Sequence, residues 1–129
     1  MNFAAHMQDA AHTQRFKVLL ATHRQEALGY LHRSEAEQYA LAEERPAEAG
    51  DLCNQTTSRE ELFGRISNHR RLLQRIEAAL RRIEFGTFGV CRECGHEIKP
   101  KRLEAMPWTE YCVRCQEKLE RVGVSRPAW

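Results

Sequence analysis

Apolar residues recur along residues 59–84 at alternating spacings of four and three, and this pattern places them on one stripe of an α-helix. The stripe consists of Leu62, Ile66, His69, Leu73, Ile76, Leu80 and Ile83. We therefore predict an amphipathic helix with a coiled-coil seam. His69 is its one polar member. It is either a satisfied seam residue or a pH-sensitive contact.

A second helix is predicted upstream, over residues 13–44. This stretch lacks proline, contains one glycine and is rich in Ala, Leu, Gln, Glu and Arg, which favour helix. Its apolar stripe is less regular, because Arg24, Ser34 and Gln38 interrupt the spacing. Residues 1–12 show no periodicity and are predicted to be a disordered N-terminus.

Turn-forming residues separate the two predicted helices. Residues 45–56 contain Pro46, Gly50, Asp51 and Asn54. Thr57 and Glu60 have the spacing of a capping box, which predicts that the second helix begins near there. The chain is thus predicted to be mainly α, with a long antiparallel hairpin over residues 13–85 and a tip near 45–56.

Composition agrees with a thin helical core and excludes some functions. The 129 residues are 42% hydrophobic but only 8% aromatic, and 20 basic against 18 acidic side chains leave a formal net charge of +2. This charge gives no argument for nucleic-acid binding. No apolar run approaches the roughly 18 residues of a membrane span, and a secretory signal pattern is missing. We expect a cytoplasmic protein that does not bind membranes.

Four of the five cysteines form two Cys-x-x-Cys pairs, and 17 residues separate the pairs: Cys91, Cys94, Cys112 and Cys115. Because cytoplasmic thiols stay reduced, this pattern predicts a zinc site rather than disulfides. Four thiolates fill the tetrahedron, so we expect one structural Zn²⁺. The alternatives are a catalytic dithiol, or His96 in place of one ligand.

The zinc site defines a small C-terminal domain. We predict a four-cysteine zinc finger over residues 86–122 that folds around the metal. Residues 116–122 are predicted to form its short closing helix, and 123–129 a flexible tail. The sequence contains no Ser/His/Asp set, open metal site or phosphate-cradling glycine loop, so we expect no enzyme activity.

A small basic cluster lies between the cysteine pairs. Lys99, Lys101 and Arg102 are interleaved with Glu97 and Glu104. Such a cluster is either a solvated turn or a contact for phosphate.

Three motifs around the cysteines carry a resemblance to a known family: Phe88–Gly95, Lys101–Pro107 and Cys112–Lys118. Together with the hairpin they resemble the DksA/TraR family of bacterial transcription regulators over about residues 13–121. The resemblance implies that the zinc finger docks on the outside of bacterial RNA polymerase. The hairpin would enter the secondary channel and bring its tip near the active site. Direct DNA binding is not expected.

The resemblance also implies a role for the tip. Longer family members carry Asp-x-x-Asp-x-Ala there, and counting back from the first zinc cysteine places Glu48, Asp51 and Cys53 on this motif. Glu48 is longer than Asp and Cys53 is larger than Ala. The resemblance therefore supports docking on the polymerase more strongly than a regulatory effect of the tip. The alternative is a protein that competes for the polymerase but whose tip has a weakened effect. Cys53 is expected to be inert, because acidic neighbours raise a thiol pKa; a redox sensor is its alternative.

By the same count, the basic residues with which the family holds guanosine tetraphosphate fall on Arg75, Met106 and Gln116. Only Arg75 keeps the charge. Since each charge-assisted hydrogen bond contributes about 1.5–3 kcal/mol, we predict a reduced or absent response to this nucleotide.

Two other functions stay open. The first is a nucleic-acid-binding zinc module, favoured if Lys99, Lys101 and Arg102 share one face with Arg114. The second is a non-catalytic interaction protein that uses the hairpin for self-association.

Overall fold

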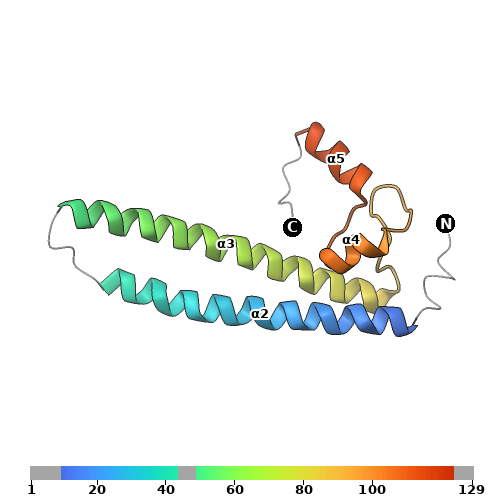
Figure 1. The fold of residues 1–129 in the computed structure, drawn as a ribbon, viewed down its shortest axis with the longest axis horizontal. Helices are drawn as coiled ribbons and strands as arrows, with labels where there is room; N and C mark the ends of the chain where they lie inside the picture. The colour runs from blue at the N-terminus through green and yellow to red at the C-terminus, as the bar shows by residue number, and fades with distance from the viewer. Residues whose placement is uncertain (1–9, 44–48, 124–129) are drawn as a thin grey trace. The chain divides into compact units, whose positions relative to one another are not determined.

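The computed structural model describes residues 10–43 and 49–123, and over 49–56 it describes only the backbone. Within these ranges the protein is mainly helical, as predicted, and its β-structure is one isolated antiparallel bridge between Val90 and Glu97. Four helices follow in chain order (Figure 1): α2 (Ala10–Glu43), α3 (Ala49–Phe85), α4 (Pro100–Ala105) and α5 (Val113–Arg121). None of these helices is both long enough and apolar enough to cross a membrane.

The described residues divide into two compact units. The shaft unit contains residues 24–74, and the finger unit combines residues 10–23 with 75–123. Both long helices therefore contribute to both units.

The shaft unit is held together by apolar contacts between α2 and α3, which run side by side in Figure 1. Its core consists of Leu31, Leu62 and Ile66, with Leu41 and Leu73 packed against them. These residues include three members of the predicted seam. Since apolar residues spaced by three and four share one helix face, the seam predicted from sequence became the packed face.

His69 is packed within the shaft unit. Its ring stacks on Tyr30 with 3.7 Å between centroids and 15° between planes. Its Nδ1 lies 2.9 Å from the carbonyl oxygen of Arg65 and donates a hydrogen bond to it. These contacts match the first of the two predictions for His69, a satisfied seam residue.

The start of α3 differs from the prediction. The helix begins at Ala49, so the predicted turn over 45–56 is wrong for residues 49–56. No proline follows Pro46 before Pro100, and each glycine or asparagine inside a helix costs at most about 1 kcal/mol. Continued backbone hydrogen bonding outweighs these weak local signals, and the predicted capping box at Thr57 lies inside the helix.

The first long helix is slightly longer at its start than predicted. It begins at Ala10 rather than Thr13 and ends at Glu43. The ring of His12 meets that of Phe16 edge-on, with 4.6 Å between centroids. This contact stabilises the first turns, so the prediction of disorder is wrong for residues 10–12. Residues 1–9 lie outside the described residues.

Within the finger unit, the segments that follow α3 pack on the start of α2 and the end of α3. Phe16 and Leu20 of α2 and Ile76 of α3 are fully buried there. The ring of Phe88, from the segment after α3, lies 5.4 Å from the ring of Phe16. Trp108 meets His23 edge-on at 5.1 Å. Long-range aromatic contacts therefore join the loop segments of this unit to α2.

Two short helices complete the finger unit. α4, which was not predicted, begins with Pro100 at a position where proline favours a helix, and it buries Leu103. α5 begins at Val113, three residues before the predicted closing helix. The chain takes up a positive φ of 81° at Gly123, which ends the helix as predicted.

Candidate metal centre

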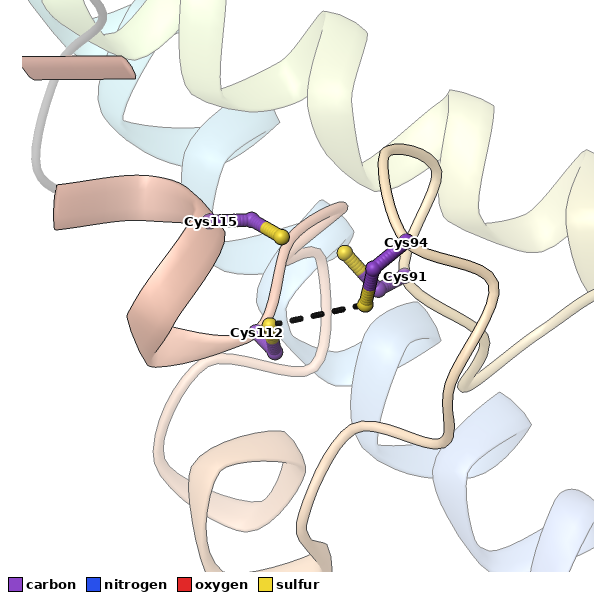
Figure 2. Close-up of side chains that lie close together, drawn as sticks. All are labelled: Cys91, Cys94, Cys112 and Cys115. Carbon is purple, nitrogen blue, oxygen red and sulfur yellow. Dashed lines mark hydrogen bonds between the residues drawn. The ribbon is translucent and has the colours of Figure 1, made fainter. Parts of the chain in front are cut away.

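The four paired cysteines converge within the finger unit. Cys91 and Cys94 lie in the loop after α3, Cys112 is the N-cap of α5, and Cys115 lies in its first turn (Figure 2). All four sulfur atoms lie within 4.8 Å of one another. The Sγ atoms of Cys94 and Cys112 are 3.9 Å apart. The fold thus brings together the four residues that the sequence predicted as ligands.

A tight turn of the backbone presents the first cysteine pair. The amide of Gly95 donates to the carbonyl of Cys91 at 3.0 Å, and the amide of Cys91 donates to the carbonyl of His96 at 2.8 Å. Gly95 has a φ of 75°, which glycine adopts without strain. The Cys-x-x-Cys-Gly sequence therefore folds into a knuckle with both thiols on its inner side.

The second pair is presented by the start of a helix. The amide of Gln116 donates to the carbonyl of Cys112 at 2.9 Å, which forms the first turn of α5. Because residues three apart share one side of a helical turn, Cys112 and Cys115 face the same point. Cys115 is 8% exposed and Cys91 2% exposed.

A second layer of polar contacts holds the segment that leads into Cys112. The amide of Arg92 donates to the carbonyl of Glu110 at 2.9 Å. The carboxylate of Glu110 lies 3.3 Å from a guanidinium nitrogen of Arg92 and 3.7 Å from one of Arg82. Arg102 donates through Nε to the carbonyl of Tyr111 at 2.9 Å. These contacts orient the ligands, as outer-layer groups do at metal sites.

The protonation of the thiols reflects their surroundings. Burial raises the pKa of Cys91, but backbone amides, first that of Cys94, outweigh it and bring the value to about 6. Burial, followed by hydrogen bonds with neighbouring thiols, raises the pKa of Cys115 to about 12. The amide of His96 lowers the pKa of Cys94, yet burial and the Cys91 thiol raise it overall.

These donors fit zinc. Zn–S bonds of about 2.3 Å in a tetrahedron require sulfur atoms about 3.8 Å apart, close to the distance between Cys94 and Cys112. Four cysteine ligands leave no position for water or substrate, which is typical of structural rather than catalytic zinc sites.

Zinc affinity is expected to rise steeply with pH. The metal-free thiols of Cys94 and Cys115 have raised pKa values and carry protons at neutral pH. Because zinc binds thiolates, binding must release at least these two protons. The dissociation constant should therefore fall about a hundredfold or more per pH unit between pH 6.5 and 8. Chelator competition at several pH values measures it; a constant affinity over this range would contradict the prediction.

The structure divides the predicted basic cluster. Lys99 and Lys101 are exposed at the start of α4, whereas Arg102 is half-buried and bound to the carbonyl of Tyr111. A guanidinium that holds the fold is less available for phosphate. The part of the cluster that faces solvent is therefore smaller than the sequence indicated.

A cavity of about 220 Å³ brings Arg75, Met106 and Gln116 together. The sequence related these three residues only by counting along the family pattern. Cationic and acidic side chains both line the cavity: Arg75, Arg102, Glu110, Glu117 and Glu120. Gln116 donates through Nε2 to a carboxylate oxygen of Glu120 at 3.1 Å. Acidic side chains outnumber cationic ones in this cavity, so its charge does not favour the binding of a phosphate group.

The predicted tip residues are only partly within the described chain. Glu48 lies outside the described residues. Asp51 and Cys53 lie in the first turns of α3, where only the backbone is described. Their predicted roles at the tip stay predictions.

The segment that contains the four cysteines is similar to a known zinc-finger family. Residues 86–121 match the family model of the prokaryotic dksA/traR C4-type zinc finger. This range almost coincides with the predicted zinc finger. The chain is 41% identical over 93 residues to an uncharacterized protein of Aquifex aeolicus, a match that covers 71% of this chain and 64% of that protein.

Named relatives match a shorter part. The chain is 36% identical over 73 residues to the RNA polymerase-binding transcription factor DksA of Haemophilus influenzae, which covers 54% of this chain and 50% of that protein. The chain thus spans between half and two thirds of these curated relatives.

The solved structure of transcription factor DksA2 from Pseudomonas aeruginosa has a similar fold over most of its length. The TM-score is 0.79 at 30% identity, and the match covers 95% of this chain and 92% of that one. The similarity therefore extends through the long helices as well as the finger.

Proposed function

Because the chain belongs to the DksA/TraR family of C4-type zinc-finger proteins, we propose that it is a transcription factor that binds bacterial RNA polymerase. The observation that carries the proposal is the 95% coverage of this chain by the DksA2 fold. Two relatives that match over a shorter part of the chain are RNA polymerase-binding transcription factors, and this supports the choice of partner. The proposed role is regulatory and non-catalytic.

The proposed cofactor is one structural Zn²⁺ held by the four clustered cysteines. Their sulfur atoms lie close enough for a single ion, and this set leaves no open coordination position. When bound, the ion would supply cross-links between the loop after α3 and the start of α5. The chain's own contacts, above all those of Glu110, would orient the second cysteine pair.

The proposed mode of action follows the family resemblance. The finger would dock on the outside of the polymerase, the hairpin would enter the secondary channel, and the tip would lie near the active site. Glu48 and Asp51 would then act on charged groups within the channel.

A pull-down with purified bacterial RNA polymerase tests the proposal. Wild type and the tip variant Glu48→Ala plus Asp51→Ala should both be retained, whereas Cys112→Ser should be lost, because its finger lacks a complete zinc site. Folded, zinc-loaded wild type that fails to bind polymerase would refute the proposed function.

The tip variant is also expected to separate binding from regulation. Removing these two carboxylates should change polymerase affinity by less than about fivefold, which corresponds to about 1 kcal/mol, because a solvated ion pair contributes about 0–1 kcal/mol. The effect on transcription in vitro should disappear. The exposed acids Glu60 and Glu61 of α3 provide a matched control, since Glu60→Ala plus Glu61→Ala removes the same charge outside the tip motif. Equal transcriptional effects of wild type and tip variant would contradict this role.

The nucleotide response is expected to be weak in wild type and to increase when the missing cations are introduced. Met106→Arg plus Gln116→Lys adds two positive groups to a cavity that already contains Arg75. With about 1.5–3 kcal/mol for each charge-assisted bond, the nucleotide affinity should rise at least tenfold. Transcription with and without guanosine tetraphosphate measures the change, and Met106→Ala plus Gln116→Ala is the uncharged control. Strong synergy with wild type would contradict the prediction.

The nucleic-acid alternative receives less support, because Arg102 is engaged by the carbonyl of Tyr111. Self-association through the hairpin stays a prediction, and the molar mass in solution measured by light scattering tests it.

A further inference from the structure

A groove of about 560 Å³ lies between the end of α3 and the first cysteine knuckle, within the finger unit. Ala78 contributes to it from α3, and Thr87, Val90 and Gly95 from the following loop. Four further side chains give the groove its chemical character: Arg81, Arg82, Arg92 and Phe85. It is a different cavity from the one that contains Arg75.

The groove carries excess positive charge. Its described lining residues include three arginines against one carboxylate, that of Glu110, and one thiol, that of the buried Cys91. The Glu110 carboxylate is already shared, because it pairs with Arg82 at 3.7 Å and with Arg92 at 3.3 Å. Arg81 is exposed and forms no ion pair with any described residue.

The charges of Arg81 and Arg92 act on the guanidinium of Arg82. Burial lowers the pKa of Arg82, Glu110 raises it, and the positive charges of Arg92 and Arg81 lower it again. Arg82 is further occupied by the carbonyls of Trp108 and Thr109, at 3.4 and 3.5 Å. Arg81 and Arg92 are thus the two cations that can meet an external anion, and the side chain of Arg92 is 59% exposed.

An aromatic ring borders these cations. Phe85, the last residue of α3, is 77% exposed, the highest value among the large hydrophobic residues of the described chain. An aromatic side chain next to arginines is typical of the centre of protein interfaces, where both residue types are enriched. Covering Phe85 would remove apolar area from water, while carboxylates would compensate the guanidinium charge.

We propose that this groove docks an acidic polypeptide segment that presents carboxylates to Arg81 and Arg92 and an apolar side chain to Phe85. The inference rests on the proposed function, with the segment belonging to RNA polymerase. A protein partner fits better than nucleic acid, because two exposed guanidiniums beside an aromatic ring form a short patch, whereas nucleic-acid sites neutralise many phosphates in a row.

The test measures the affinity of the full zinc-loaded chain for purified RNA polymerase at several salt concentrations. Arg81→Gln plus Arg92→Gln should weaken binding about tenfold and reduce its salt dependence. Phe85→Ala should weaken binding about fivefold. Arg81→Gln alone breaks no ion pair between described residues, so a broken ion pair within the chain cannot explain its expected threefold loss of binding. Zinc content and helical circular dichroism verify the folding of every variant.

Lys99→Gln plus Lys101→Gln is the matched control, because it removes the same charge from exposed positions outside the groove. Unchanged binding of this control together with weakened groove variants supports the inference. Wild-type affinity in all groove variants would overturn the inference and leave the proposed function standing. Failure of wild type itself to bind would overturn both. A duplex DNA that binds wild type, and is lost with the groove variants while polymerase binding persists, would overturn it in favour of nucleic acid.

Discussion

Cys112→Ser is expected to lower zinc affinity about a hundredfold to a thousandfold. Structural zinc sites bind with about 10–16 kcal/mol, and the loss of one of four thiolates removes roughly a quarter of this, or about 2.5–4 kcal/mol. Serine has nearly the same shape, but its hydroxyl stays protonated at neutral pH and is a poor zinc ligand. Zinc content after dialysis against a weak chelator measures the effect.

The consequence for structure should be confined to the finger. Cys112 is the N-cap of α5, and Trp108 and Tyr111 are buried just before it. Their near-ultraviolet circular dichroism should weaken when the metal is lost. The shaft unit is held by Leu31, Leu62 and Ile66, which take no part in the metal site, so most of the helical signal should remain.

Cys53→Ser is the matched control, because Cys53 is the one cysteine outside the two Cys-x-x-Cys pairs. It should retain zinc and polymerase binding at the wild-type level. Two results would contradict the proposed ligand set: a full equivalent of tightly bound zinc in Cys112→Ser, or loss of zinc in Cys53→Ser.

Phe16→Ala is expected to destabilise the finger unit by about 3–5 kcal/mol, the usual range for a fully buried phenylalanine. Phe16 is 0% exposed, and its ring contacts those of His12 and Phe88. Truncation would leave a cavity between α2 and the segment that leads into the zinc knuckle. Because domains of this size have about 5–15 kcal/mol of stability in total, this is a large fraction.

Urea denaturation followed by tryptophan fluorescence measures this loss, since Trp108 lies in the same unit. Phe63→Ala is the matched control, because Phe63 is 57% exposed and its truncation should cost about 0.5 kcal/mol. Equal shifts in the two denaturation midpoints would show that the contact between Phe16 and Phe88 does not hold the finger to the hairpin.

Periodicity and spacing correctly predicted the two long helices and the cysteines that cluster in the structure. Leu62, Ile66 and Ile76 follow the predicted seam and are buried. Each Cys-x-x-Cys forms its own local turn, which brings the two cysteines of that pair together. Repeating patterns of this kind are properties of neighbouring residues, so the sequence alone reveals them.

Local signals were less reliable where they compete with helix formation. The glycine and asparagine between 49 and 56 predicted a turn, but the continuing helix outweighs them and α3 begins at Ala49. The proline at position 100 was a usable signal for α4, whose six residues are too few to show a periodic pattern.

The helical hairpin and the four-cysteine finger can be predicted from the order of residues alone, because those features depend on periodicity and short-range spacing. The contacts of charged side chains that lie far apart in the sequence become apparent only in the folded chain. It binds Arg102 to the carbonyl of Tyr111 and surrounds Glu110 with Arg82 and Arg92. It also places Arg81, Phe85 and Arg92 around one groove. Whether a charged side chain supports the fold or faces a partner depends on which segments meet in three dimensions, and the order of residues along the chain does not contain that information.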